Sequence, residues 1–486
     1  MRLTSILFLA LSLAAVRNAD AQELIYAEAM PPVSVFSFSS LPPAAEGESR
    51  AIEQHERHSA LELWLSRPLE TAAAPPTSVP TITAPPMKAL FKASAETNLY
   101  PADAAGAVGR NHVVGVTNQL VTIHKRTGEV LASSSVRAFM GGATENVDFY
   151  DSRIAYDAAS DRWVLICLRA GGTDVVVAVS QTGDPAAAWS RYRINYTQIA
   201  PSRVDYSHIA MTRDSVVFSM YAADLTAAAI SIRKNDLYAS PATLPITKYY
   251  FPDVDDVVPA ENDESGVEYM VSRYGVKRLD RFGSPWVTTK HAADCACGFP
   301  FSLPQQGSTT GLDPGYGDID AVVYRGGAIY AVRTTGRGNP FRDVLWWWKA
   351  DAETGDVLDE GLIDDQAGGK SYAYPSLAVN HAREMLIGFG VFANNMYASA
   401  GYLFRDAAGR ISTIASIKSG NAPYTGHTDS FSGAQGQRWG DYTTTVLDPA
   451  SDNAFWTIQL VTEGNRWSAW WANVEVPFGR RRSVKK

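Results

Sequence analysis

Residues with catalytic or ligand-binding side chains recur at equivalent positions in this chain, each just ahead of an apolar pair that opens a β-rich run. Seven such positions follow one another at spacings of 47, 55, 48, 64, 56 and 68 residues. In order, they are Gly106, Arg153, His208, Asp256, Asp320, Ser376 and Thr444. A site assembled from them would combine a cation, an imidazole, carboxylates and hydroxyls, which are the groups that general acid–base chemistry uses.

Two kinds of catalysis are open to these residues. In the elimination reaction of a uronate-containing polysaccharide, Arg153 or Arg438 would neutralise the uronate carboxylate. Tyr206 or His208 would then take the adjacent C–H proton. Paired carboxylates would instead hydrolyse a glycosidic bond. A structural role stays open beside both, because repeated aspartates at strand starts often accept turn amides.

Binding without catalysis is the first expectation for the same positions. The residues predicted to contact a ligand are Asp256, Asp320, Tyr374 and Tyr442. Carboxylate oxygens are also the ligands that Ca²⁺ prefers. A calcium site is therefore predicted at Asp255, Asp256, Asp318 and Asp320, and no other cofactor is expected.

The elements that must position these residues repeat as well. Runs such as Val175–Val179, Ser215–Ser219 and Ala328–Arg333 are rich in β-branched and aromatic residues and are bounded by turn formers. One four-stranded blade needs about 40–50 residues. The spacing therefore predicts an all-β fold, a propeller of seven four-stranded blades, with six or eight as the neighbouring counts. Ring closure requires an N-terminal strand, for which Met87–Phe91 is the candidate.

The N-terminal region differs in composition from the repeat. Residues 1–21 have the charged start, short apolar core and small-residue cleavage site of a signal peptide. They predict export to the periplasm, the cell surface or the medium. Residues 22–87 form an Ala/Pro-rich, flexible arm with one possible helix at 48–66. The propeller is expected at 88–478, and residues 479–486 form a basic tail.

Composition and charge exclude several function classes. The formal net charge of −8 argues against a nucleic-acid partner, and no later apolar stretch is long enough to cross a bilayer. No serine-hydrolase elbow, phosphate loop or zinc-protease motif occurs. Three cysteines make no disulfide framework, and Cys167 is expected to be a buried core thiol. The predicted partner is a glycan or a protein, and we expect a monomer.

Two segments carry a family resemblance. Asp151–Trp163, followed by Ala178–Pro185 and Trp189, resembles secreted bacterial β-propellers of the sialidase-like type that contain Asp boxes. Arg438–Tyr442 with Asp448–Trp456 resembles the last blade of such proteins. The resemblance implies a propeller over roughly residues 95–475. It does not imply sialidase activity. The segment that corresponds to the Asp box is longer here and has its residues in a different order, and no arginine triad falls on matching positions.

These observations favour an exported propeller that binds a carbohydrate or protein ligand at the channel mouth or on its outer loops. A polysaccharide lyase or glycoside hydrolase that uses the channel residues is the alternative, and an interaction scaffold is the second alternative. Tryptophans at 346–348 and 467–471 are expected to pack between blades, with a sugar-stacking platform as the other interpretation.

Overall fold

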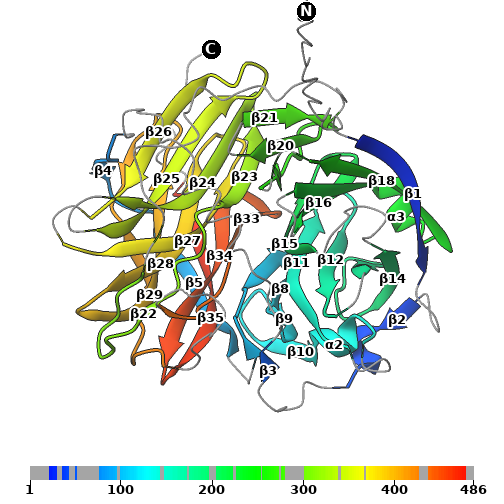
Figure 1. Cartoon of the computed structure of the whole chain (residues 1–486), viewed down its shortest axis with the longest axis horizontal. Helices are drawn as coiled ribbons and strands as arrows, with labels where there is room; N and C mark the ends of the chain where they lie inside the picture. Colours follow the sequence, from blue (N-terminus) through cyan, green and yellow to red (C-terminus); the bar gives the residue numbers. More distant parts are fainter. Residues whose placement is uncertain are drawn as a thin grey trace, which may run out of the picture.

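The repeats fold into seven blades around a central axis, as Figure 1 shows, so the predicted β-propeller is confirmed. The computed structural model describes residues 21–29, 35–42, 50–51, 76–95, 99–142, 147–171, 174–195, 204–222, 226–252, 254, 256–272, 275–279, 300, 302–337, 341–365, 368–425 and 436–477. Most of the predicted signal peptide, Asp255, Cys295, Cys297 and the basic tail lie outside these residues. So does the predicted helix at 48–66, except for residues 50–51, which form a short strand.

Each blade is an antiparallel sheet whose first strand lines the central channel. The first three blades are β7 (Ala105–Val108), β8 (His112–Val116), β9 (Leu120–Lys125) and β10 (Val130–Ser135); β11 (Phe149–Asp157), β12 (Arg162–Arg169), β13 (Asp174–Ser180) and β14 (Ala188–Asn195); and β15 (Val204–Met211), β16 (Ser215–Ala222), β17 (Thr226–Arg233) and β18 (Thr243–Phe251). The fourth, within its described residues, is β19 (Val258–Pro259), β20 (Tyr269–Ser272) and β21 (Gly275–Arg278).

The last three blades carry longer strands. They are β23 (Ile319–Arg325), β24 (Ala328–Arg337), β25 (Arg342–Asp351) and β26 (Val357–Ile363); β27 (Ser371–Val379), β28 (Met385–Ala393) and β29 (Met396–Arg405) with β30 (Ile411–Ser412) and β31 (Ala415–Lys418); and β33 (Thr444–Asp448), β34 (Ser451–Glu463), β35 (Arg466–Glu475) and β5 (Met87–Ala95). Short helical turns are η1 (Phe38–Ser40), α2 (Val136–Phe139) and α3 (Lys234–Tyr238).

The ring is closed by the N-terminal strand. β5 pairs antiparallel with β35 and becomes the outermost strand of the seventh blade, as the position of Met87–Phe91 predicted. Neighbouring inner strands touch all the way round, from β7 through β11, β15, β19, β23, β27 and β33 back to β7. Residues spread over the whole repeat therefore meet at one axis.

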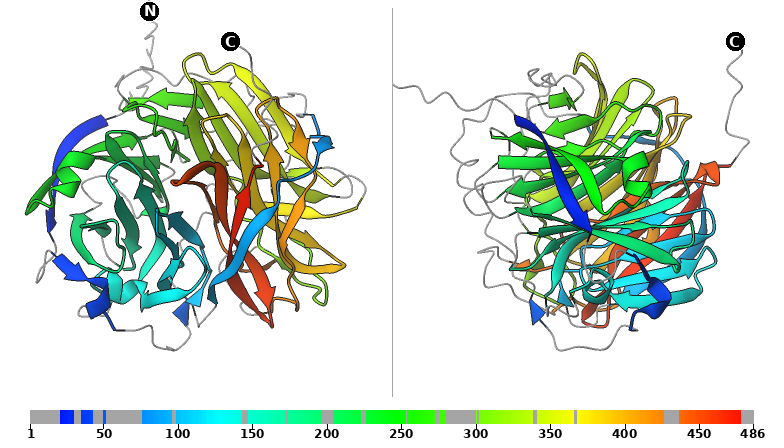
Figure 2. Two further views of the ribbon diagram at one scale, coloured as in Figure 1. Left: turned by 180° about the vertical axis from the view of Figure 1, so that it is seen from behind. Right: turned by 90° about the vertical axis from the view of Figure 1, so that its right-hand side faces the viewer.

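The arm before β5 is partly strand, which composition alone did not indicate. β1 (Ala21–Ala29) pairs with β18 over eight residues and reaches β14, so it joins the outer edges of the second and third blades (Figure 2). β2 (Val35–Ser37) also pairs with β14, and β4 (Pro80–Ile82) pairs with β30. Two short parallel pairs complete the strands, β3 (Arg50–Ala51) with β6 (Leu99–Tyr100) and β22 (Gly311–Leu312) with β32 (Gly436–Gln437).

Apolar and aromatic side chains fill the spaces between blades. Of the clustered tryptophans, 346, 347, 348, 467 and 471 are buried, as the inter-blade interpretation predicts. Trp471 lies so close to Gly106 that a Cβ there would collide with its ring. Gly106 thus serves packing between the seventh and first blades. Cys167 is a free, buried thiol beside Ser152, as expected.

The Asp-box-like segment forms the hairpin between β13 and β14. Ser180 accepts a hydrogen bond from the Trp163 amide, and Asp184 accepts one from the Ala186 amide. Trp189 donates its indole N–H to the Pro185 carbonyl. All these contacts stabilise the turn, so the segment has a structural role here.

Candidate functional site

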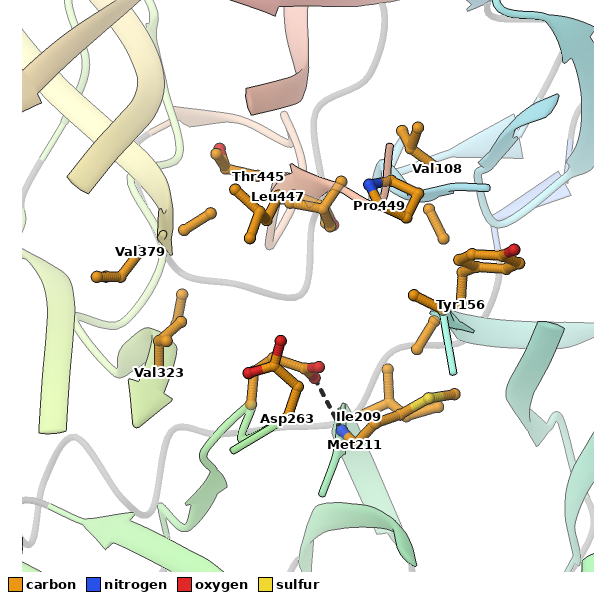
Figure 3. Close-up of a pocket in the computed structure, with 18 of the residues that line it drawn as sticks. Val108, Tyr156, Ile209, Met211, Asp263, Val323, Val379, Thr445, Leu447 and Pro449 are labelled. Atoms are coloured by element: carbon orange, nitrogen blue, oxygen red, sulfur yellow. Dashed lines mark hydrogen bonds between the residues drawn. The ribbon is translucent and has the colours of Figure 1, made fainter. Parts of the chain in front are cut away.

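A cavity of about 590 Å³ follows the central channel and is lined by all seven inner strands. Figure 3 shows side chains from different blades, among them Ile209, Val323 and Val379, facing one another across it. We call the end where the inner strands begin the entry end; it contains Asp151, Arg153, Tyr206, His208, Asp320 and Tyr442. The end where these strands finish is the exit end; it contains Asp157, Glu261, Asp263, Arg325, His381, Asp448 and Asp452.

Backbone irregularities aim the entry-end residues. The pairing of β11 shifts between Tyr150 and Arg153, and that of β15 shifts between Asp205 and His208. Asp151 and Tyr206, at the corresponding positions of these bulges, have positive φ values of 50° and 48°. A bulge re-aims the side chain that follows it, so the repeated irregularity turns Arg153 and His208 toward the channel.

Arg153 is the central cation of the entry end. Its side chain is 6% exposed and lines the cavity. The guanidinium carbon lies 3.2 Å from the Tyr442 ring centroid and 5.7 Å from that of Tyr206. Its Nε and Nη2 are buried and have no hydrogen-bond partner among the described residues. Arg153 therefore holds a desolvated charge whose hydrogen-bonding capacity the protein leaves partly unused.

Tyr206 and His208 form an aromatic pair beside this cation. Their ring centroids are 4.7 Å apart and the planes are nearly perpendicular. The Tyr206 amide donates to Asp151 Oδ2 at 2.6 Å, which fixes the residue at its bulge. Three of the four residues predicted for catalysis, Arg153, Tyr206 and His208, thus come together in space.

Arg438, the fourth predicted catalytic residue, is placed differently. Its guanidinium is buried between Asp441, at 2.6 Å, and Asp313, at 3.5 Å. Tyr374 lies close by and donates its hydroxyl to the Asp313 carbonyl. Arg438 and Tyr374 are absent from the cavity lining described above and hold the loops over the entry end together.

Tyr442 and the predicted carboxylates surround the same end. Burial raises the pKa of the Tyr442 hydroxyl well above its ordinary value, which the nearby Arg153 charge opposes, and this hydroxyl donates to the Ser152 carbonyl. Burial, and then the charge of Asp318, raise the pKa of Asp320 well above its ordinary value.

Asp256 accepts a hydrogen bond from the Ile319 amide and so links the fourth and fifth blades. Asp320 is the predicted acid that faces the cavity.

A hydroxyl-rich wall faces the channel from the sixth and seventh blades. Ser376 bonds to Thr443 at 3.0 Å and to Thr445 at 2.8 Å. The Gln459 amide donates to Ser376 and Thr443 behind them. Ser376, Thr443 and Thr445 line the cavity, so one wall offers hydroxyls for exchangeable hydrogen bonds with a polyol. The sequence repeat indicated Ser376 of this wall, and it also indicated Thr444, which lines the cavity beside it.

Three aspartates at the entry end form a cluster that was not assigned from sequence. Asp103, Asp151 and Asp441 each offer a carboxylate oxygen, and these oxygens lie within 4.8 Å of one another. Burial, and then the charge of Asp441, raise the pKa of Asp103 to about 7. The sequence could have indicated this cluster, because an aspartate stands at the start of the repeated strand segment at residues 103, 151, 205 and 441.

Charges at the exit end are mostly paired. Asp157 contacts Lys234 Nζ at 3.1 Å and accepts the Tyr238 hydroxyl at 2.8 Å. Arg325 pairs with Asp263. Asp448 pairs with Arg126. The His381 Nδ1 atom lies 2.8 Å from Asp452 Oδ1 at the same end of the channel. Glu261 differs, because its Oε2 is held by the Met211 amide and its pKa is raised to about 7, mainly by burial.

Comparison with known proteins leaves the activity open. No protein-family model and no curated protein matches the sequence. The α-L-arabinofuranosidase Arb93A from Fusarium graminearum is 8% identical, with 80% of this chain and 98% of that chain covered and a TM-score of 0.38. A family-25 polysaccharide lyase, an ulvan lyase, is 9% identical, with 83% of each chain covered and a TM-score of 0.33.

An endo-arabinase from Bacteroides thetaiotaomicron is 8% identical, with 69% of this chain and 95% of that chain covered and a TM-score of 0.30. Likenesses of this level assign no substrate and no site residue to the chain. They also leave the sialidase-like resemblance unconfirmed. In the part of the chain that the structure describes, no helix has the length and apolarity that a membrane crossing requires.

Proposed function

We propose that this propeller binds an acidic glycan in its central channel, with Arg153 receiving a carboxylate of the ligand. The observation that carries the proposal is the buried Arg153 guanidinium on the cavity wall, with two nitrogens that have no partner among the described residues. A planar guanidinium binds a carboxylate through two parallel hydrogen bonds, which would satisfy these nitrogens and offset the cost of burying the charge.

The rest of the cavity supports a saccharide ligand. Its volume of about 590 Å³ falls in the range of small-molecule sites. Hydroxyls of Ser376, Thr443 and Thr445 can exchange hydrogen bonds with sugar hydroxyls, while Ile209 and Leu377 offer apolar surface to C–H groups. The predicted export of the chain agrees with a ligand met outside the cytoplasm.

Calorimetry with matched oligosaccharides tests this proposal. Each pair should share a backbone and differ only in carrying a uronate or the neutral sugar. We expect binding of the acidic member, and Arg153→Met should weaken it by roughly 10- to 100-fold, the value of a hydrogen-bonded charge. Arg213→Met is the matched control, because Arg213 lines the cavity at its far end and is exposed. Equal binding by wild type and Arg153→Met would contradict the proposal.

Catalysis at the same place is the second candidate function. The observation in its favour is that Tyr206 and His208 flank Arg153, so that a uronate carboxylate on the arginine would bring its neighbouring C–H bond to their side. Arg153 would stabilise the developing enolate while one of the two rings removes the proton. The glycosidic C–O bond β to the carboxylate would then break and a C=C bond form, with the departing oxygen protonated by the other ring or by water.

A lyase leaves an unsaturated sugar, whose ultraviolet absorbance reports each cleavage. We expect either His208→Ala or Tyr206→Phe, whichever removes the base, to abolish product formation while oligosaccharide affinity, measured separately, changes by less than about threefold. If acidic oligosaccharides bind and remain intact over a wide pH range, the channel is a binding site without this activity.

A further inference from the structure

The aspartate cluster at the entry end joins three blades. Asp103 precedes β7 in the first blade, Asp151 lies in β11 of the second, and Asp441 precedes β33 of the seventh. Their carboxylate oxygens approach within 4.8 Å. Asp103 is fully buried, Asp151 is 1% exposed, and Asp441 is mostly covered. Like charges this close repel strongly in a buried environment, so the cluster requires positive charge or protons.

The protein supplies only part of that compensation. Arg438 bonds to Asp441 and also serves Asp313. Asp103 accepts hydrogen bonds from the Asn118 side chain at 2.5 Å and from the Asp441 amide at 2.7 Å. These contacts orient the carboxylates around the Arg438 charge.

Asp151 provides the independent sign of a missing ligand. Its Oδ2 accepts the Tyr206 amide, but its Oδ1 is buried and has no hydrogen-bond partner among the described residues. An orphaned carboxylate oxygen in the interior is costly, and native proteins satisfy such atoms with protein groups, water or ions. Here the orphan belongs to a residue whose carboxyl lies close to three others, those of Asp205, Asp103 and Asp441.

We propose that Asp103, Asp151 and Asp441 bind a calcium ion that ties the first, second and seventh blades together at the entry end. All the donors are oxygens, which favours a hard cation. With Ca–O distances of about 2.3–2.6 Å, oxygens on opposite sides of the ion are about 5 Å apart, so the three carboxylates fit around one ion without moving the strands.

The ion would lie at the seam where the ring closes. β5 closes this seam at the outer edge by pairing with β35, while the inner strands β33, β7 and β11 touch at the axis. A cation bound to residues 338 positions apart would fasten the inner edge. This site is separate from the acidic set at residues 255, 256, 318 and 320 that the repeat suggested.

Terbium luminescence tests the proposal directly. Tb³⁺ replaces Ca²⁺ at oxygen sites and is excited by nearby aromatic rings, which Tyr206 and Tyr442 provide beside the cluster. Chelator-treated full-length protein should show sensitised emission that Ca²⁺ competes away, and Ca²⁺ should raise its Tm. We expect Asp151→Asn to weaken Ca²⁺ binding on the order of tenfold or more, because it removes one ligand charge.

Asp320→Asn is the matched control, since Asp320 is a half-buried acid that lines the channel outside the cluster. It should leave terbium and calcium binding unchanged. If Asp151→Asn does not fold, Asp441→Asn takes its place. The absence of both terbium emission and a calcium-dependent Tm in the wild type would overturn the proposal and leave shared protons as the compensation. Loss of binding in Asp320→Asn with retention in Asp151→Asn would also overturn it.

Discussion

The two ends of the channel use the same strands and treat charge in opposite ways. At the exit end, Asp157, Arg325 and Asp448 each contact a group of opposite charge. At the entry end, the Arg153 guanidinium and the Asp151 carboxylate have buried atoms without partners among the described residues. Buried charge is tolerated for stability when it is paired, so the exit end is explained by folding alone.

The entry end is not explained by folding alone. The positive φ values at Asp103, Asp151, Tyr206 and Tyr374 are all found at strand starts on this side. Strained backbone and incompletely paired charge persist where a ligand completes the site. The difference between the ends supports the proposal that the exit end serves folding and that the entry end serves ligand binding.

Replacing one buried arginine at each end gives the largest expected contrast. Arg325→Met leaves Asp263 and Glu264 without their cation and the Val379 carbonyl without a donor. We expect a loss of about 2–4 kcal/mol in the free energy of unfolding, reduced because the acidic partners are partly exposed. Arg153→Met removes a cation that stacks on the Tyr442 ring but has no ion pair among the described residues, so ligand-free stability should stay within about 1 kcal/mol of wild type.

Urea denaturation of the three proteins without ligand measures this contrast. The assignment of the two ends would be wrong if Arg153→Met proved the more destabilising variant. Arg213→Met, at an exposed position, gives the baseline for removing a surface charge near the channel.

Among the described residues of the exit end, the Glu261 carboxyl has no ion pair, so its charge, like those of the entry end, is incompletely compensated. Its pKa is raised to about 7, first by burial and then by Asp263. An acid with a raised native pKa contributes stability below its unfolded pKa of about 4.5 and loses that contribution as pH rises toward 7. Glu261→Gln should therefore match wild type near pH 4.5 and exceed it by on the order of 2 kcal/mol at pH 8.

Unfolding curves at three pH values test this expectation. Glu129→Gln, at an exposed residue of β9–β10, should follow wild type at every pH. A Glu261→Gln difference that is independent of pH would show that folding does not raise the pKa of this carboxyl.

The sequence indicated the ring because each blade repeats the same strand start. The register brought Arg153, Tyr206 and His208 together, since equivalent positions on inner strands must converge at the axis. It could not place Arg438, whose partner Asp441 lies in its own loop, and it gave no signal for β1, whose pairing with β18 depends on tertiary contact. The aspartate cluster lies two or three residues before the chosen register, where bulges rather than alternation set side-chain direction.

The smallest contrast compares one tyrosine hydroxyl at each end. Tyr238→Phe removes a hydrogen bond to the Asp157 carboxylate, whereas Tyr442→Phe removes one to the Ser152 carbonyl. Burial tends to raise the pKa of Asp157, but Lys234 and the Tyr238 hydroxyl lower it below its ordinary value overall. A lowered carboxyl pKa stabilises the protein above the unfolded value near 4, and this contribution is lost as pH falls through the native pKa.

Tyr238→Phe should consequently cost about 1–2 kcal/mol at pH 7, and the loss should shrink as pH falls below 4. Tyr442→Phe should cost about 1 kcal/mol with no such acid dependence, because its acceptor is an uncharged carbonyl. Denaturation at pH 7 and pH 3.5 separates the two. Equal acid dependence in both variants would mean that the hydroxyl at the exit end does not act through the Asp157 charge, and that the paired network there is weaker than its geometry indicates.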